Sequence, residues 1–394
     1  MKVEVKQVGL AESGAELVAI GAFEGTELPA PVGAASGGSD VKAGFKKLSL
    51  LRPQDFPPVL VVGLGERDEL DPERLRIAAA VVAKEAARLE ATSLAWALPE
   101  SDDPLAAAEA EAEAIVTGTI LASYRFDRFK SGDGDDSPRL ESLTLLGPAE
   151  LESAAETARI AAEAQNRARD LQGTPANFAT PSFLAERAEE IAAGSEAVSV
   201  EVLGQPELEE KGMGGLLAVS QGGPQEPKMI VLRYSGGGSG QTLGFVGKGV
   251  TFDTGGISLK PGAGMPDMKM DMSGGAAVLE AVAAIAELGL PIDLIAVVPS
   301  TENMPSGTAI KPGDIITQYD GTTVEVNNTD AEGRLILADA LAYAIELGAE
   351  RIVDLATLTG AVVIALGSTY AAVIANDDAL AAEVFRAGEE TGEL

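Results

Sequence analysis

The sequence predicts an α/β protein of two domains, a smaller N-terminal α/β domain and a C-terminal αβα domain with a mainly parallel central sheet. Short β-branched and apolar runs alternate with longer Ala-rich segments of helical periodicity along the chain. The 394 residues, 46% hydrophobic and 23% charged, suffice for two domain cores. Repeated strand–helix units favour a parallel sheet covered on both faces, and ligands of such sheets bind beyond the carboxyl ends of the strands.

Residues 1–148 are predicted to form the N-terminal domain. Its strands are expected at 3–8, 17–20, 59–62, 94–98 and 143–146, and its helices at 72–89 and 104–124. Val62-Gly63-Leu64-Gly65 has the setting of a nucleotide-binding loop, but the third glycine of that motif is absent. Acidic residues follow directly and would repel a phosphate, so a tight strand-to-helix turn is expected there.

A linker helix is predicted at 149–170, and the second domain is predicted over 171–394. Gly173-Thr174-Pro175 ends the linker helix, and Thr180-Pro181-Ser182 starts the next one with a cap and an early proline. Tyr319-Asp320-Gly321-Thr322 predicts a hairpin turn. Strands are expected at 198–202, 229–234, 243–246, 294–298 and 352–355, and helices at 274–288, 332–347 and 379–393.

The composition excludes several classes of chemistry and partner. The chain contains no cysteine and no histidine, so disulfides, thiolate or imidazole metal sites and Ser-His-Asp catalysis are excluded. A net charge of −32 opposes binding to nucleic acid. Residues 1–6 alternate charged and apolar residues and lack the apolar run of a secretory signal, so we expect a cytoplasmic protein.

One window has the length and lack of charge of a membrane-spanning helix. It covers residues 355–375 and includes Thr357, Thr359, Gly360 and Gly367. This composition fits a buried strand, a turn and a second buried element better than a membrane span. No membrane association is expected.

Two clusters of charged residues stand beside glycines and buried elements in the second domain. In the first, Asp330, Glu332 and Arg334 precede an apolar run at 335–338. The alternative interpretation is an ordinary helix start, with Thr329 or Asp330 as N-cap and Glu332 in the first turn.

The second cluster lies upstream of the first. Lys248 stands between Gly247 and Gly249 after an apolar strand, and Asp253, Gly255-Gly256 and Lys260 follow. Glycines on both sides let the backbone approach a ligand closely. Further along, Met268-Lys269-Met270-Asp271-Met272 places one acid among methionines before a helix start. For Asp271 the alternative is an ordinary helix cap.

Four carboxylates therefore fall at strand ends of one domain. If they converge, they repel one another unless cations neutralise them, and two divalent metals would do so. Carboxylate oxygens suit Mg²⁺ and Mn²⁺ and also bind Zn²⁺, so the residue types leave the metal open. The four are Asp253, Asp271, Asp330 and Glu332.

Three segments, in the same order along the chain, resemble the leucyl aminopeptidases of the cytosol aminopeptidase family. The resemblance covers residues 166–375, while the N-terminal region matches in size and α/β character only. The segments are Val246-Gly247-Lys248-Gly249-Val250-Thr251-Phe252-Asp253-Thr254-Gly255-Gly256, Met268-Lys269-Met270-Asp271-Met272-Ser273-Gly274-Gly275-Ala276 and Asn328-Thr329-Asp330-Ala331-Glu332-Gly333-Arg334-Leu335.

The resemblance implies a metal-dependent aminopeptidase that removes N-terminal amino acids, with leucine-like preference, by attack of a metal-bridging water. It implies two divalent ions per subunit, Mn²⁺ or Zn²⁺ with Mg²⁺ or Co²⁺ as alternatives. Asp253 and Glu332 would bridge them, Asp330 would complete one site, and Lys248 with Asp271 the other. A lysine ligand must be a neutral amine, which requires the metals to displace its proton.

The resemblance also implies the remaining roles. Lys260 would stabilise the oxyanion, and Arg334 would hold a bicarbonate that handles the proton of the attacking water. The partners would be peptides with a free N-terminus, and the assembly a homo-hexamer. Family members continue beyond the position matching Leu394, so we expect this chain to lack the closing elements of the catalytic domain. Substrate contacts would come from Met268, Asn328, Thr357, Leu358 and Gly360.

Two other functions compete with this interpretation. Asp253-Thr254-Gly255 is the triplet of aspartic proteases, but those enzymes need a second triplet, which this chain lacks, and an all-β fold. The other is a non-catalytic metal-binding or assembly protein of the same fold. Lys260 and Arg334, which bind no metal in the implied scheme, argue against it.

Overall fold

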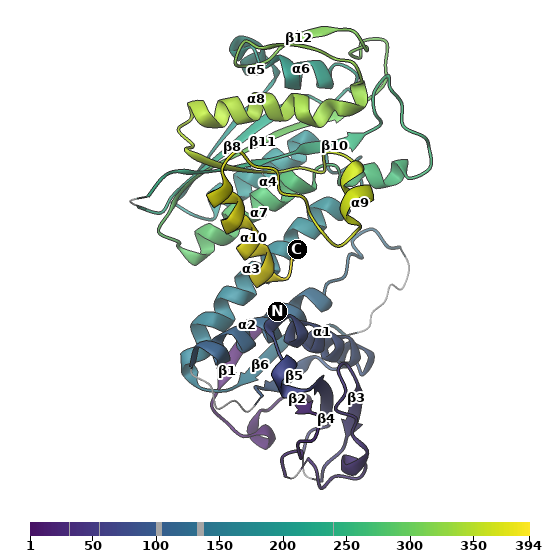
Figure 1. Cartoon of the computed structure of the whole chain (residues 1–394), viewed down its shortest axis with the longest axis vertical. Coiled ribbons are helices and arrows are strands. Elements are labelled where there is room, and N and C mark those ends of the chain that lie inside the picture. The colour runs from purple at the N-terminus through teal and green to yellow at the C-terminus, as the bar shows by residue number, and fades with distance from the viewer. Residues whose placement is uncertain (31, 55, 100–104, 132–137, 239) are drawn as a thin grey trace. The chain divides into compact units, whose positions relative to one another are not determined.

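The computed structural model describes residues 1–30, 32–54, 56–99, 105–131, 138–238 and 240–394, which form two compact α/β units (Figure 1). The first unit comprises Met1–Glu163 with Val362–Leu394, and the second comprises Ala164–Ala361. Helix α3 (Glu152–Gly173) carries the chain from the first unit into the second. The predicted α/β class is confirmed.

The first unit contains a six-stranded sheet in the order β1-β6-β5-β2-β4-β3. The strands pair in parallel except β3, which is antiparallel to β4. Helices α1 (Pro72–Arg88) and α2 (Leu105–Ala122) pack against each other. The strands are β1 (Lys2–Lys6), β2 (Leu17–Phe23), β3 (Leu48–Leu51), β4 (Val59–Gly65), β5 (Ser93–Ala97) and β6 (Ser142–Leu146).

The glycines that resembled a nucleotide-binding loop have a packing role. Gly63 lies within β4, and a Cβ atom at this position would lie 2.2 Å from the carbonyl oxygen of Gly44. Glycine is therefore required because another backbone segment passes against the strand. The expected tight strand-to-helix turn at Val62–Gly65 is wrong, because these residues form the last part of β4 and the chain turns toward α1 only after Gly65.

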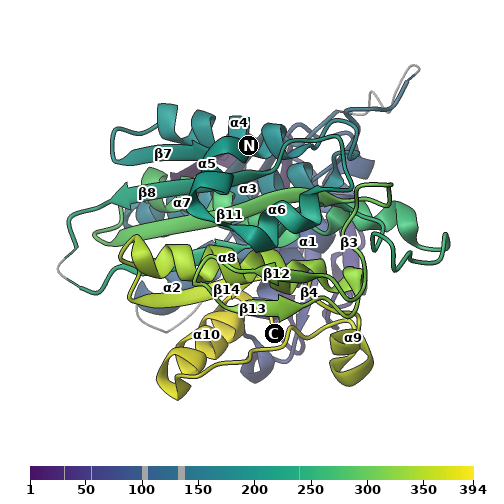
Figure 2. The same cartoon turned by 90° about the horizontal axis from the view of Figure 1, so that it is seen from above.

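The second unit is built on a six-stranded sheet, in which five strands follow the order β14-β9-β11-β8-β7 and β10 pairs with β11 beyond the end of β9. Figure 2 shows β14, β11, β8 and β7 one after the other across this sheet. Strands β14, β9, β10 and β11 run parallel, whereas β8 and β7 are antiparallel additions. The mainly parallel sheet is confirmed. The strands are β7 (Val198–Leu203), β8 (Lys228–Ser235), β9 (Leu243–Gly247), β10 (Gly249–Asp253), β11 (Asp293–Asn303) and β14 (Arg351–Leu355).

Helices cover both faces of this sheet (Figure 1). Helices α4 (Pro181–Ala193) and α7 (Ser273–Leu288) pack on one face, and α6 (Gly214–Ser220) and α8 (Glu332–Glu346) on the other. Strand β11 serves both layers, because alternate side chains of a strand point to opposite faces. Leu294, Ala296 and Val298 join the α4–α7 core, and Ile295 and Val297 join the α6–α8 core.

A small hairpin and three further α-helices make up the rest of the regular structure, apart from several 3-10 turns. Strands β12 (Ile315–Thr317) and β13 (Thr323–Glu325) pair antiparallel around Gly321, whose φ is +87°, so the predicted hairpin is confirmed. The remaining helices are α5 (Gln205–Lys211), α9 (Ala361–Leu366) and α10 (Asp378–Thr391). None of the helices in the described ranges is long and apolar enough to cross a membrane.

The expectation of a second buried element within 355–375 is wrong. The chain leaves the sheet after Leu355, at the end of the edge strand β14, and the segment beyond it is largely exposed. Ile364 is 90% exposed and Ile374 is 96% exposed. An apolar run predicts burial only where another layer packs over it, and the described part of the chain supplies no such layer for these two side chains.

Candidate metal centre and active site

The candidate site lies at the carboxyl edge of the second sheet. Strands β9, β11 and β14 are parallel and end at this edge with Gly247, Asn303 and Leu355. Helices α7 and α8 begin here, so Asp271 just before α7 and Glu332 at the start of α8 come to the same place. Side chains that are 84 residues apart in sequence, from Lys248 to Glu332, thus converge because the strands are parallel.

A break between two strands places Lys248. Strand β9 ends at Gly247 and β10 begins at Gly249, and both pair with β11, with a shift in register between Val250 and Phe252. The backbone N–H of Lys248 donates to the Leu355 carbonyl at 3.0 Å instead of to β11. Irregularities of this kind beside active sites turn a side chain in a new direction.

The glycines after Asp271 allow this break to pack closely. The backbone N–H of Gly275 donates to the Lys248 carbonyl at 2.8 Å. A Cβ atom at Gly274 would lie 1.9 Å from the Leu355 carbonyl oxygen. The start of α7 therefore packs directly on the strands, which only residues without a side chain permit.

The side chain of Lys248 is 1% exposed and lies between two carboxylates. Its Nζ is 2.8 Å from Asp271 Oδ1 and 2.8 Å from Glu332 Oε1, and it donates to the Thr357 carbonyl at 3.0 Å. Burial lowers the pKa of Lys248, but the charges of Glu332 and Asp271 outweigh burial and raise it. Without a competing cation, Lys248 is therefore protonated.

Burial perturbs the ionisation of Asp271. Burial raises its pKa to about 7, more than the nearby Lys248 lowers it. The hydroxyl of Thr357 donates to Asp271 Oδ1 at 2.7 Å. A carboxyl group so poorly solvated is a strong candidate for a ligand that a metal keeps ionised.

Lys260 holds the second pair of acids. Its Nζ lies 2.9 Å from Asp253 Oδ2 and forms an ion pair with Asp330 Oδ1. Burial lowers the pKa of Lys260, but its hydrogen bonds with Asp330 and Asp253 outweigh burial and raise it. Lys260 is therefore a permanent positive charge at the centre of the acids.

The loop between Asp253 and Lys260 is fixed by Thr329. Gly255 and Gly256 have φ values of +86° and +66°, which favour glycine. The hydroxyl of Thr329 donates to the Gly255 carbonyl at 2.7 Å and accepts the backbone N–H of Ser258 at 2.8 Å. The loop that carries Lys260 is thereby attached to the segment that carries Asp330 and Glu332.

The donor set fits divalent metal ions. Asp253, Asp330 and Glu332 each offer an oxygen, and these oxygens lie within 4.8 Å of one another. Asp271 Oδ2 and Asp330 Oδ1 are buried oxygens with no hydrogen-bond partner among the described residues, although each lies near a lysine ammonium. The two lysine ammonium groups neutralise part of the charge of the four acids, and divalent cations would neutralise the rest. Oxygen-rich sites suit Mg²⁺, Mn²⁺ and Zn²⁺.

Asn303 belongs to this site but was not predicted from the sequence. It ends β11, is 2% exposed, and its Nδ2 lies 2.8 Å from Asp253 Oδ1 and 3.3 Å from Glu332 Oε2. The predicted strand ended at Val298, whereas β11 continues for five further residues. The available signal was the polar run Ser300 to Asn303 directly behind a buried parallel strand.

The other predicted residues differ in exposure, and of them only Asn328 has a side-chain hydrogen bond to one of the predicted ligand residues in the part of the chain that the structure describes. Arg334 is exposed, and no ion pair or hydrogen bond of its side chain is found within the described ranges. Asn328 is exposed and accepts the backbone N–H of Asp330 through Oδ1 at 2.9 Å. Met268 is half-buried, whereas Leu358 and Gly360 are exposed beyond the end of β14.

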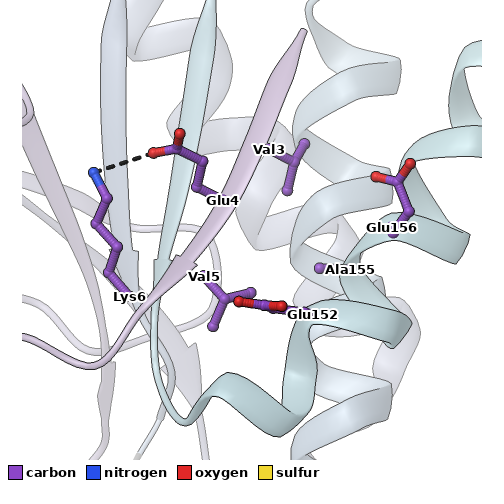
Figure 3. Close-up of a pocket in the computed structure, with 7 residues that line it drawn as sticks. All are labelled: Val3, Glu4, Val5, Lys6, Glu152, Ala155 and Glu156. Atoms are coloured by element: carbon purple, nitrogen blue, oxygen red, sulfur yellow. Dashed lines mark ion pairs between the residues drawn. The ribbon is translucent and has the colours of Figure 1, made fainter.

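A separate pocket of about 460 Å³ in the first unit does not share these features (Figure 3). Val3 and Val5 from β1 lie on the side nearer Glu152 and Glu156 from α3, whereas Glu4 and Lys6 point to the other side of the strand. Glu4 pairs with Lys6 at 3.1 Å, and Glu156 pairs with Arg159 at 2.6 Å. Two of the three acids already have basic partners, so the pocket offers less for a cation than the site in the second unit.

Comparison with known proteins assigns the chain to a family. The profile described as "Cytosol aminopeptidase family, catalytic domain" matches residues 166–394. The chain belongs to the cytosol aminopeptidase family. The N-terminal-domain profile of the cytosol aminopeptidases matches residues 41–133, so the resemblance extends into the N-terminal region as well.

Individual cytosol aminopeptidases are similar over most of their length. A probable cytosol aminopeptidase of Roseiflexus castenholzii is 42% identical, covering 100% of this chain and 82% of that protein. One from Syntrophotalea carbinolica is 48% identical over 85% of this chain and 68% of the relative. Both confirm the predicted family.

Solved structures of the cytosol aminopeptidase fold agree. A mutant of tomato leucine aminopeptidase superposes with a TM-score of 0.88 at 34% identity, covering 100% of this chain and 81% of the other. The bottromycin maturation enzyme BotP in complex with Mn superposes with a TM-score of 0.85 at 36% identity, covering 96% and 80%. The protein is a metal-dependent aminopeptidase, and the aspartic-protease alternative is wrong.

Proposed function

We propose that this aminopeptidase is a di-metal leucyl aminopeptidase, which removes N-terminal amino acids from peptides with a leucine-like preference. The observation that carries the proposal is the gathering of five potential ligands at one sheet edge. The oxygens of three of them lie within 4.8 Å of one another, and the Lys248–Asp271 pair adjoins them through Glu332. The five are Lys248, Asp253, Asp271, Asp330 and Glu332.

These residues would hold two divalent ions, Mn²⁺ or Zn²⁺, with Mg²⁺ or Co²⁺ as alternatives. Asp253 and Glu332 would contact both ions, Asp330 would complete one site, and Lys248 with Asp271 the other. When bound, the ions would lower the pKa of a water molecule and polarise the peptide carbonyl. Lys248 must lose its proton to become a ligand. Burial lowers the pKa of Lys248, and it would favour that loss once metal ions, rather than the ammonium group, neutralise Glu332 and Asp271.

Lys260 and Arg334 would act on the reacting groups. Lys260 remains charged because its pKa is raised, so it can stabilise negative charge on the carbonyl oxygen of the substrate. Arg334 follows Glu332 by two residues on α8 and is exposed without an ion pair in the described ranges. Its guanidinium is therefore free to hold a bicarbonate, a planar anion that can accept the proton of the attacking water.

The substrate would be a peptide with a free amino terminus. An uncharged terminal amine offers a further ligand to a divalent ion, which an internal peptide segment cannot supply. Contacts with the peptide would come from residues around the mouth of the centre, of which Thr357 touches Asp271 through its hydroxyl. These residues are Met268, Asn328, Thr357, Leu358 and Gly360.

A chromogenic leucyl-anilide assay tests the proposal. The purified protein is assayed with Mn²⁺, after removal of metal by a chelator, and after Mn²⁺ is added back. Activity that the chelator abolishes and Mn²⁺ restores, with two ions per chain by elemental analysis, supports the di-metal enzyme. Metal binding without hydrolysis would favour the non-catalytic metal-binding alternative, and one ion per chain would contradict the two-site arrangement.

Three further proposals accompany this function. We propose that the catalytic domain spans 171–394, supported by the catalytic-domain profile over 166–394. A cytoplasmic location is supported by the name that the relatives carry. A homo-hexamer is supported by the family resemblance, and analytical ultracentrifugation of the metal-loaded protein would test it.

A further inference from the structure

Asn303 occupies the middle of the proposed metal site without being one of its proposed ligands. It pairs in register with Asp253 across strands β11 and β10, so both side chains emerge at the same level of the sheet edge. Its side chain is buried, and Glu332 and Thr329 approach it from the start of α8. A buried amide in such a position requires hydrogen-bond partners.

The amide nitrogen of Asn303 faces acceptors only. It lies 2.8 Å from Asp253 Oδ1, 3.0 Å from the Thr329 carbonyl oxygen and 3.3 Å from Glu332 Oε2. Three surrounding oxygens fix this end of the amide as the donor end. An amide has two N–H bonds, so each of the two nearer acceptors accepts one of them. The more distant Glu332 carboxylate shares one of these two hydrogens.

These contacts divide each of two carboxylates into a held oxygen and a free one. Asp253 Oδ1 accepts from Asn303 and from the Gly255 N–H at 2.8 Å, whereas Asp253 Oδ2 faces the Lys260 ammonium. Glu332 Oε2 accepts from Asn303, whereas Glu332 Oε1 faces the Lys248 ammonium. In both residues the free oxygen is the one that already points at a positive charge.

We infer that Asn303 is a positioning residue, which orients Asp253 and Glu332 so that one oxygen of each faces the metal ions. This inference rests on the proposed di-metal function. A neutral donor between two anionic ligands also reduces their mutual repulsion without adding charge. Hydrogen-bond partners behind metal ligands contribute about 10–100-fold to metal affinity or activity, so the same range is expected here.

The test compares Mn²⁺ binding by the full-length wild type with two variants and one control. Asn303→Leu keeps the branched shape of the side chain but removes both donors and is bulkier, whereas Asn303→Ala removes the donors without adding bulk. Ser300→Ala is the matched control, because Ser300 is also buried on β11 but donates to the Gly249 carbonyl at 3.0 Å and touches no carboxylate. Thermal unfolding of each metal-free protein establishes that it folds.

Calorimetric titration with Mn²⁺ should give a Kd about 10–100-fold weaker for both Asn303 variants and a nearly unchanged Kd for Ser300→Ala. Electron paramagnetic resonance of the Mn²⁺-saturated variants should show an altered spectrum, which a loss of stability alone would not produce. Wild-type affinity and spectrum in a folded Asn303→Leu or Asn303→Ala protein would overturn the inference, as would equal weakening in the control. A wild type that binds no Mn²⁺ would instead contradict the proposed function itself.

Discussion

Lys260 Nζ lies 2.9 Å from Asp253 Oδ2, the oxygen of Asp253 that Asn303 leaves free. The ammonium therefore occupies the side of Asp253 on which a proposed metal ion would lie. Lysine and metal compete for this oxygen, while the catalytic role proposed for Lys260 requires it to stay close. Removal of the Lys260 ammonium should therefore affect turnover and metal affinity differently.

Lys260→Ala should reduce turnover by about 10²–10³-fold, the usual effect of removing one group that stabilises an oxyanion. Metal affinity should stay the same or increase, because a competing positive charge leaves Asp253 and Asp330. Steady-state kinetics and Mn²⁺ titration measure the two effects. Lys311→Ala, which removes an exposed lysine paired with Asp314, is the control. Empty metal sites in Lys260→Ala would show that the lysine is itself needed for binding.

Asp330→Asn and Glu332→Gln should each lower metal occupancy and activity together. Both changes keep the side-chain shape but remove a negative charge from the group of oxygens within 4.8 Å. The loss of affinity should be at least about tenfold, since even partners behind a ligand contribute that much. Elemental analysis after dialysis measures the bound metal. Full occupancy in either variant would remove that residue from the ligand set. Asp314→Asn is the control, because this aspartate pairs with Lys311 and lies outside the group of oxygens.

Gly333→Ala should inactivate the enzyme with little change in folding. A Cβ atom at this position would lie 2.7 Å from Lys248 Cε and 2.8 Å from Lys248 Nζ, so Lys248 must leave its place between Asp271 and Glu332. Gly307→Ala is the control, because no heavy atom lies within 4 Å of a Cβ atom there. Activity and Mn²⁺ affinity are compared for the two variants. Equal activity would mean that the position of Lys248 is not critical.

Asp339 should make the stability of the protein depend on pH below neutrality. Burial raises its pKa from 3.8 to about 6, more than the backbone N–H groups of Leu216 and Tyr319 lower it. At pH values between these two pKa values, Asp339 holds a proton in the folded state that it has lost in the unfolded state. The free energy of unfolding should therefore decrease by ~3 kcal/mol as pH rises from about 4 to 6, and this contribution should level off above that range.

The measurement is urea unfolding of the chelator-treated protein at several pH values, for the wild type and Asp339→Asn. The asparagine cannot ionise, so the variant should lack this part of the decrease. It should also be less stable overall, because its NH₂ group meets a backbone N–H donor where the carboxylate had an acceptor. An identical pH dependence in the two proteins would contradict the assignment.

Much of the second unit could be predicted because its central strands β8 and β11 are buried on both faces and its helices follow the expected periodicity. Strand β11 and helix α8 illustrate this: an apolar run marks the first, and the charged start followed by apolar residues marks the second. The four acids could be singled out because each stands close to glycine or apolar residues. They were expected at strand ends, but only Asp253 ends a strand, and the other three lie just before or at the starts of α7 and α8. Their convergence follows from parallel strands.

Other features depend on contacts between distant residues and could not be predicted. Strand β10 was missed because its pairing with β11 begins only after the break at Lys248. Asn303 was missed because its role depends on which acceptors surround it, and neighbouring residues in the sequence do not reveal them. The segment after Leu355 was expected to be buried because apolar composition alone does not indicate whether another layer covers it.

The direct pairing of Asp253 with Asn303 has a consequence for folding as well as catalysis. A slip of β10 by one residue against β11 would turn Asp253 to the opposite face and separate it from its amide partner. Metal ions would then bind only to chains with the correct strand alignment and would enrich that population by mass action. Metal uptake during refolding would in this way report whether the two strands have found their proper alignment.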